Sequence, residues 1–290
     1  MRSLPPWSGS PSPSRAVVVS LADSDRRPGF FAQPLGEIFE VFDAFHGATQ
    51  DWTPYFDAER FAGNYLRPPD PAEIGCAISH AQVIRAFAAE PGDDADLLLV
   101  AEDDARFTAD LPCALRAVTE GPLPHDAVVL TDGLSLDPAL HRRRFLTSIS
   151  QLSLLSRTVS GPERRHRIGR FAGQGDCSGL YLMTRSGARK FDDYVRALPE
   201  GKLQRVADAW PDLRDEGGVD VALVRPSLVR WSGGSTIRAS EDGPAARREA
   251  PLPPSLRDRI AVRSRLRGAG PALRATVDDA GYRLRGVFRS

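Results

Sequence analysis

The chain has 290 residues, 41% of them hydrophobic and 26% charged, which is the composition of an ordinary globular protein. Its 38 basic and 38 acidic side chains balance, so no overall charge draws the molecule to nucleic acid or to a membrane surface. Three widely spaced cysteines support neither a disulfide framework nor a zinc motif. Because no segment has the roughly 20 apolar residues of a membrane span and the first residues lack a signal-peptide core, we expect a cytoplasmic protein.

The first predicted elements are two strands behind a short leader. Residues 1–14 are rich in Pro, Ser and Gly and are expected to be disordered. A strand over 16–21 ends in the polar turn 22–27, and a second strand includes Ile38 to Phe42. Asp43 follows that second strand directly.

A helix is predicted over 71–90. Asp70 is the expected N-cap, Pro71 the first helical residue and Glu73 the capping-box partner. Gly75 lies in the first turns, where glycine costs about 1 kcal/mol relative to alanine, and this favours a close approach by another backbone or a ligand. His80 falls at the edge of the apolar stripe, where we expect it to bond a neighbouring loop in a structural rather than a catalytic role.

The next predicted strand, Leu97 to Ala101, runs directly into Glu102, Asp103 and Asp104. In an open α/β sheet, ligands bind at the carboxyl ends of strands, and adjacent buried acids need a cation to offset their repulsion. In an extended segment Glu102 and Asp104 project to one side, which predicts that they share a Mg²⁺ or Mn²⁺ ion. Asp103 would then hydrogen-bond backbone or ribose. The alternative is a solvated acidic turn.

The rest of the chain continues the alternation of strands and helices. Strands over 127–130, 179–183 and 219–224 and a helix over 186–198 predict an α/β sheet with helices on both faces. The Arg- and Gly-rich stretch 157–176 lacks apolar periodicity, which indicates a functional lid or disorder. These patterns predict a main domain over 15–240 and an arginine-rich helical tail over 241–290. That tail either packs on its own domain or makes peripheral contact with anionic lipid.

Six segments resemble glycosyltransferase family 25, which contains lipooligosaccharide galactosyltransferases and collagen galactosyltransferase domains. They span residues 16 to 238 in the family's order. The most specific signal is EIGCAISH followed by a strand and EDD. The segments are VVVSLADSDRR, FDAFHG, EIGCAISH, LLVAEDDARF, GLYLMTRSGARKF and VRPSLVRWSGGSTI.

The resemblance implies a glycosyltransferase A-type fold, a Rossmann-like mixed sheet that uses a nucleotide-diphosphate sugar and a divalent metal. The family's acidic motif maps onto Glu102 and Asp104 as metal ligands, with Asp103 at the nucleotide. Further donor-binding positions come from its GCxxSH signature, from the turn after the first strand, and from its FDAxxG piece. They are Gly75, Ser79 and His80; Asp23, Arg26 and Arg27; and Asp43, while Cys76 also matches the signature.

The chain departs from the family's pattern at the general base. The family has a Pro-hydrophobic-Asp piece after the SGA helix, and its best counterpart here is Arg205 to Asp208. Asp208 is therefore the first candidate for the base and Asp176 the second. An arginine from 157–170 would help to neutralise the departing diphosphate. Two smaller departures are Ser20, where the family has Asn, and Ala101, where it has Leu.

The expected activity is metal-assisted transfer of a sugar from a UDP-sugar, with inversion. The expected sugar is galactose. The acceptor would be a hydroxyl of a glycan such as lipopolysaccharide or capsule. The alternative is a catalytically inactive module that binds a sugar nucleotide or a glycan. The balanced charge of the core argues against nucleic acid as a partner.

Overall fold

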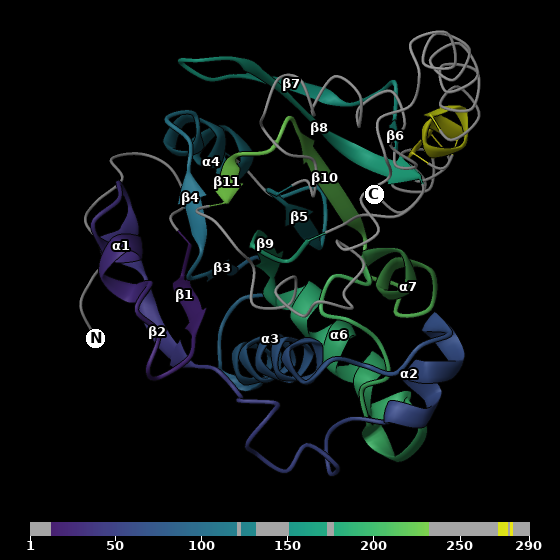
Figure 1. The fold of residues 1–290 in the computed structure, drawn as a ribbon. Helices are drawn as coiled ribbons and strands as arrows, with labels where there is room; N and C mark the ends of the chain where they lie inside the picture. The colour runs from purple at the N-terminus through teal and green to yellow at the C-terminus, as the bar shows by residue number, and fades with distance from the viewer. Residues whose placement is uncertain are drawn as a thin grey trace, which may run out of the picture.

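A computed structural model of the chain describes residues 13–120, 123–131, 151–172, 177–231, 272–277 and 279–280. Within this part of the chain, nine strands form one mixed sheet (Figure 1). Two further short strands, β4 (Ala105–Phe107) and β11 (Val229–Trp231), form a separate antiparallel pair. The spatial order of the main sheet is β2 (Glu40–Asp43), β1 (Arg15–Ser20), β3 (Leu97–Glu102), β9 (Leu180–Thr184), β5 (Ala127–Val129), β10 (Val221–Arg225), β8 (Arg165–Ala172) and β6 (Gln151–Leu152), with β7 (Arg157–Ser160) paired to β8.

One edge of this sheet collects the carboxyl ends of three neighbouring strands. Strands β2, β1 and β3 are parallel, with Val19 in register with Glu102 and Ser20 with Asp43. Strand β9 runs antiparallel to β3, so the residues just before it reach the same edge, where the Glu102 N–H donates to the Gly179 carbonyl at 3.0 Å. Such an edge is the usual ligand-binding side of an α/β sheet.

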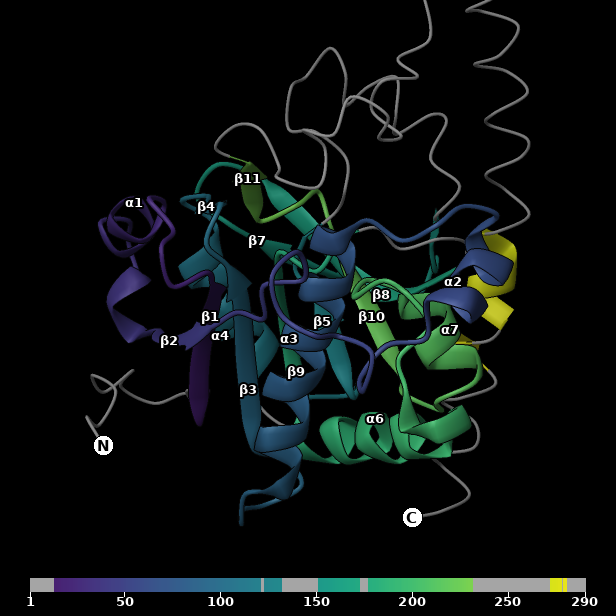
Figure 2. The same ribbon diagram turned by 60° about the horizontal axis from the view of Figure 1, so that its bottom comes forward.

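Helices cover both faces of the sheet (Figure 2). Successive strand residues point to opposite faces, so Ala16 and Val18 of β1 join one apolar layer while Val17 and Val19 join the other. This confirms the predicted fold class. The first layer holds α1 (Arg27–Phe31) and α4 (Leu111–Thr119), and the second holds α3 (Pro71–Ala89), α6 (Arg185–Ala197) and α7 (Trp210–Asp215); the shorter elements are α2 (Ala58–Tyr65) and the 3-10 turns Gly36–Ile38 and Pro199–Gly201.

Helix α3 begins as predicted. The Asp70 carboxylate accepts the Ala72 N–H at 2.8 Å, the Glu73 carboxylate accepts the Asp70 N–H at 3.0 Å, and Pro71 is the first helical residue. These bonds satisfy donors that every helix leaves open in its first turn. The helix ends at Ala89, one residue before the predicted end.

The glycine in the first turns of α3 is explained by backbone contact. A Cβ on Gly75 would lie 2.6 Å from the Phe45 carbonyl oxygen and 3.0 Å from the Gly47 nitrogen. Gly47 is equally constrained, since its Cβ would lie 1.8 Å from the Pro71 carbonyl oxygen. The chain after β2 therefore packs directly on the helix backbone, which holds the end of β2 beside α3.

We expect Gly75→Ala to lower the free energy of unfolding by about 1–2 kcal/mol. Overpacking typically costs about 1–3 kcal/mol, and the better helix propensity of alanine returns up to about 1 kcal/mol of this. The matched control is Gly63→Ala in α2, where a Cβ meets nothing within 4 Å and we expect a gain of about 0.5–1 kcal/mol. Urea unfolding of both variants checks the pair. Equal effects would contradict the contact argument.

The stretch 157–176, predicted to be a lid or disordered, is structured over most of its length, so that prediction is wrong for the described residues. Residues 157–160 and 165–172 form the antiparallel strands β7 and β8, and β8 pairs with β10 inside the main sheet. The second strand of the chain also begins later than expected, at Glu40, because Gly36–Ile38 forms a 3-10 turn.

The described part of the C-terminal tail is helical over 272–277 and 279–280 and lies beside β6 (Figure 1). Ser153 Oγ donates to the Asp279 carboxylate at 2.9 Å, and the Leu154 N–H donates to Thr276 Oγ1 at 2.9 Å. These contacts favour packing of this piece on its own domain. The predicted division at residue 240 falls outside the described residues and stays a prediction. Among the helices that are described, none is both long and apolar enough to cross a bilayer.

Candidate active site

The three acids of the EDD motif lie at the edge where β1, β2 and β3 end. Glu102 is the last residue of β3, but Asp103 and Asp104 form a turn into β4. The extended geometry that placed Asp103 opposite its neighbours therefore does not hold. Asp103 Oδ1 and Asp104 Oδ2 lie 3.6 and 3.7 Å from the same atom, Arg26 Nη1.

Asp103 is held by side chains from the end of β1 and from the turn that follows it. Its Oδ2 accepts hydrogen bonds from Ser20 Oγ at 2.7 Å and Ser24 Oγ at 2.5 Å. Ser20 also accepts from Arg27 Nε at 3.0 Å, and Arg27 Nη2 donates to the Asp43 carboxylate at 2.6 Å. The contacts thus link the first turn, the end of β2 and the acid motif. Asp23, in the same turn, is exposed.

Glu102 and Asp104 differ in how readily they ionise. Burial opposes ionisation of Glu102, but contacts with His80 and Ser178 outweigh it and lower the pKa of Glu102. For Asp104, burial and then the charge of Glu102 raise the pKa to about 7, with Arg26 opposing. The three acids thus lie close together at this edge, and Asp103 and Asp104 share the Arg26 guanidinium. Such a site favours a bound cation.

Glu102 reaches across to α3 and to the residues before β9. Its Oε1 accepts from Ser178 Oγ at 2.5 Å and lies 3.4 Å from His80 Nε2. The other ring nitrogen of His80, Nδ1, is 3.0 Å from the Tyr181 hydroxyl. His80 is buried and bonds a residue of strand β9, not the loop that the sequence predicted. Sequence reasoning missed Tyr181 and Ser178 as partners of this site, because the helical pattern around His80 says nothing about residues so much later in the chain.

The other members of the GCxxSH signature position backbone. Ser79 Oγ donates to the Gly75 carbonyl at 2.6 Å and accepts from the Phe45 N–H at 2.8 Å. Together with the Gly75–Gly47 contact, this bond fixes the chain that follows Asp43. Cys76 is half-buried, and burial, followed by the charge of Glu102, raises the pKa of its thiol.

Asp208 lies next to the same edge. Its Oδ2 accepts from the Cys177 N–H at 2.6 Å, and the Cys177 carbonyl in turn accepts from Trp210 Nε1 at 3.1 Å. Cys177 directly precedes Ser178, the partner of Glu102, so Asp208 belongs to this cluster. It is half-buried in the turn before α7. Asp176, the other candidate base, lies outside the described residues.

Residues 14–208 match the model of glycosyltransferase family 25, described as an LPS biosynthesis protein. The chain belongs to this family. The matched region holds the acid motif, the GCxxSH signature and, at its last residue, Asp208. None of the curated proteins matches the chain. The Rossmann-like mixed sheet described above agrees with a glycosyltransferase fold.

Within the family 25 domain, one predicted element of the site lies elsewhere. The arginines described between 157 and 170 are placed on β7, β8 and the turn between them, and β8 is four strand positions from β3, or roughly 19 Å at ~4.8 Å per strand. Arg170 instead pairs with Asp220 at 2.7 Å. Arg26, from the turn after β1, lies beside the Asp103 and Asp104 carboxylates instead.

Proposed function

We propose that this family 25 glycosyltransferase transfers galactose from UDP-galactose to a hydroxyl of a lipopolysaccharide- or capsule-type glycan, with inversion at the anomeric carbon. The observation that carries the proposal is the set of buried acids with Arg26 at the carboxyl ends of β1 and β3, adjacent to Asp208. An activated sugar needs charge stabilisation on its diphosphate and a base for the acceptor, and this edge offers both.

The residues fit a hard divalent cation. Glu102 and Asp104 supply carboxylate oxygens, which Mn²⁺ and Mg²⁺ prefer. Burial and then the charge of Glu102 raise the pKa of Asp104, and a bound cation would favour its ionised form. We assign the ion to Glu102 and Asp104. When bound, it would neutralise charge on the departing diphosphate.

The remaining roles fall to the chain's own side chains. Arg26 and Arg27 lie at the ends of β1 and β2, where they can bind phosphate oxygens. Asp103 and Asp43 are assigned to the nucleotide. Asp23, which is exposed in the turn that also holds Arg26, is assigned to it as well.

Residues of α3 serve the donor site by holding other groups in place. Ser79 and Gly75 hold the chain after β2, and His80 holds the Glu102 carboxylate.

Asp208 is assigned as the base that takes the proton of the acceptor hydroxyl. The hydrogen bond from the Cys177 N–H fixes the direction of this carboxylate. Asp176 remains the second candidate. We also keep, as predictions, a cytoplasmic location and peripheral contact of the tail with the inner face of the plasma membrane.

Release of UDP tests the function. The full chain is incubated with UDP-galactose, UDP-glucose and related donors, with lipopolysaccharide-type and capsule-type acceptors, with Mn²⁺ or with a chelator. We expect metal-dependent UDP release that rises on addition of acceptor and is highest with UDP-galactose. Binding of donors without release, across all acceptors, would favour the inactive binding module instead.

A further inference from the structure

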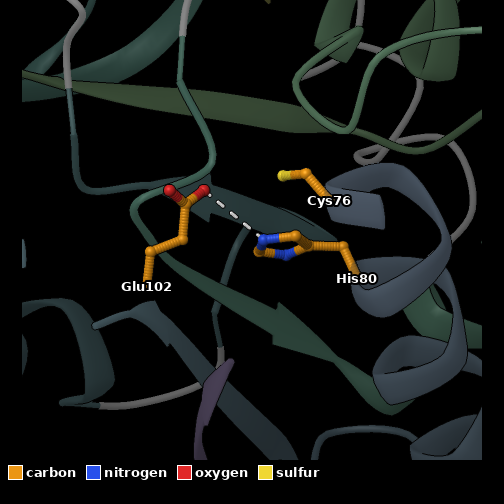
Figure 3. A group of neighbouring side chains, drawn as sticks. All are labelled: Cys76, His80 and Glu102. Carbon is orange, nitrogen blue, oxygen red and sulfur yellow. Dashed lines mark ion pairs between the residues drawn. The ribbon is translucent and has the colours of Figure 1, made fainter. Parts of the chain in front are cut away.

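The side chains of Cys76, His80 and Glu102 converge on one point inside the molecule (Figure 3). Among the described residues, this is the one group of three or more His, Cys, Asp or Glu side chains whose ligand atoms all lie within 4.8 Å of one another. Cys76 and His80 are four residues apart and project from the same face of α3, and Glu102 approaches from the end of β3.

The histidine is aimed into this point without a well-formed hydrogen bond there. His80 is 3% exposed, and its Nε2 makes no hydrogen bond within the described part of the chain, although Glu102 Oε1 lies 3.4 Å away. Nδ1 contacts the Tyr181 hydroxyl at 3.0 Å. A metal-bound histidine typically donates its second N–H to such an outer partner, which fixes the ring.

The geometry matches a tetrahedral ion of the zinc class. Zn–N and Zn–O distances of about 2.0–2.2 Å place two ligands roughly 3.4 Å apart, which is the observed separation of His80 Nε2 and Glu102 Oε1. The thiol must approach by no more than roughly 1 Å for a Zn–S distance of ~2.3 Å. Ser178 Oγ, which donates to Glu102 and lies 4.0 Å from Cys76 Sγ, completes the outer partners.

We propose that Cys76, His80 and Glu102 form a binding site for a thiophilic divalent cation such as Zn²⁺, separate from the hard-cation site assigned to Glu102 and Asp104. A sulfur ligand and an imidazole select zinc-class ions over Mg²⁺ and Mn²⁺. Three protein ligands leave a fourth position for water. Since Glu102 belongs to both sites, bound Zn²⁺ is expected to inhibit sugar transfer, and this consequence alone rests on the proposed function.

Cobalt absorption tests the site without any substrate. The full chain, freed of metal, is titrated with Co²⁺, and Zn²⁺ affinity is measured by calorimetry. We expect a thiolate-to-cobalt charge-transfer band that Zn²⁺ abolishes. Cys76→Ser should remove the band and lower Zn²⁺ affinity by about 100-fold or more, since even outer-shell changes typically cost 10–100-fold.

Two other cysteines provide matched controls for Cys76→Ser, and a third variant changes the hydrogen-bond partner of His80. Cys113→Ser, at an exposed position, and Cys177→Ser should keep the band. Tyr181→Phe should keep it too, with Zn²⁺ affinity about 10–100-fold lower. No band in the unmodified chain, or a band that survives Cys76→Ser or disappears in Cys177→Ser, overturns the proposal. None of these outcomes depends on UDP release, so the two hypotheses fail separately.

Discussion

Asp104→Asn is expected to lower kcat/KM for sugar transfer by about a thousandfold, the loss of roughly 4 kcal/mol of transition-state stabilisation. The change removes one charge of the proposed cation site but keeps the shape of a side chain that is 7% exposed. The comparison is made from initial rates of UDP release at saturating Mn²⁺.

The fold should survive this change. Burial raises the pKa of Asp104 to about 7, so the folded chain binds a proton there more tightly than the unfolded chain does. The carboxylate therefore destabilises the fold increasingly as pH rises from about 4 to 7. Without added metal at pH 8, we expect Asp104→Asn to unfold no more easily than the unmodified chain. Asp93→Asn, an exposed acid before β3, is the control. Full activity of Asp104→Asn would remove the metal-site hypothesis.

Asp208→Asn should leave donor binding intact and lower kcat by about 10²–10⁴-fold, the usual contribution of a general base. The amide oxygen can still accept from the Cys177 N–H, so the local structure is kept while the proton acceptor is lost. UDP affinity by calorimetry and single-turnover rates separate the two effects.

Asp212→Asn is the matched control for the base, because Asp212 lies on α7, pairs with Arg205 and has no assigned role. We expect it to keep near-normal turnover. If Asp208→Asn instead abolishes UDP binding, Asp208 belongs to the nucleotide site, and Asp176 becomes the leading candidate for the base.

The elements that could be predicted from sequence are those with local signals. Helix α3 begins at Pro71, and the residues that set this start, Asp70, Pro71 and Glu73, are close together in the sequence. Strand β3 is a run of apolar residues buried on both faces. Strand β8 was missed because its inward position 166 is histidine. His166 is fully buried through hydrogen bonds to Asp110 at 2.9 Å and the Pro226 carbonyl at 2.8 Å. Both partners are distant in sequence, so no local pattern shows them.

The site could be predicted in its location but not in its internal geometry. The acids at the end of β3 and the glycine contact in α3 follow from strand topology and from the cost of a helical glycine. The direction of Asp103 was wrong because the chain turns after Glu102. Arg26 lies beside the acids because β1 and β3 are adjacent in space, and the Cys76, His80 and Glu102 cluster joins two motifs about twenty residues apart. Tertiary packing brings together both Arg26 with the acids and the three members of this cluster, so neither contact could be predicted from local sequence.

Calorimetric titration of UDP, with Mn²⁺ and with a chelator, tests most directly whether Glu102 and Asp104 hold a cation against the donor's diphosphate. In the unmodified chain we expect Mn²⁺ to raise UDP affinity by at least about tenfold, or ~1.4 kcal/mol, and in Asp104→Asn we expect no such gain. UDP affinity that is the same with and without Mn²⁺ in the unmodified chain would contradict the account.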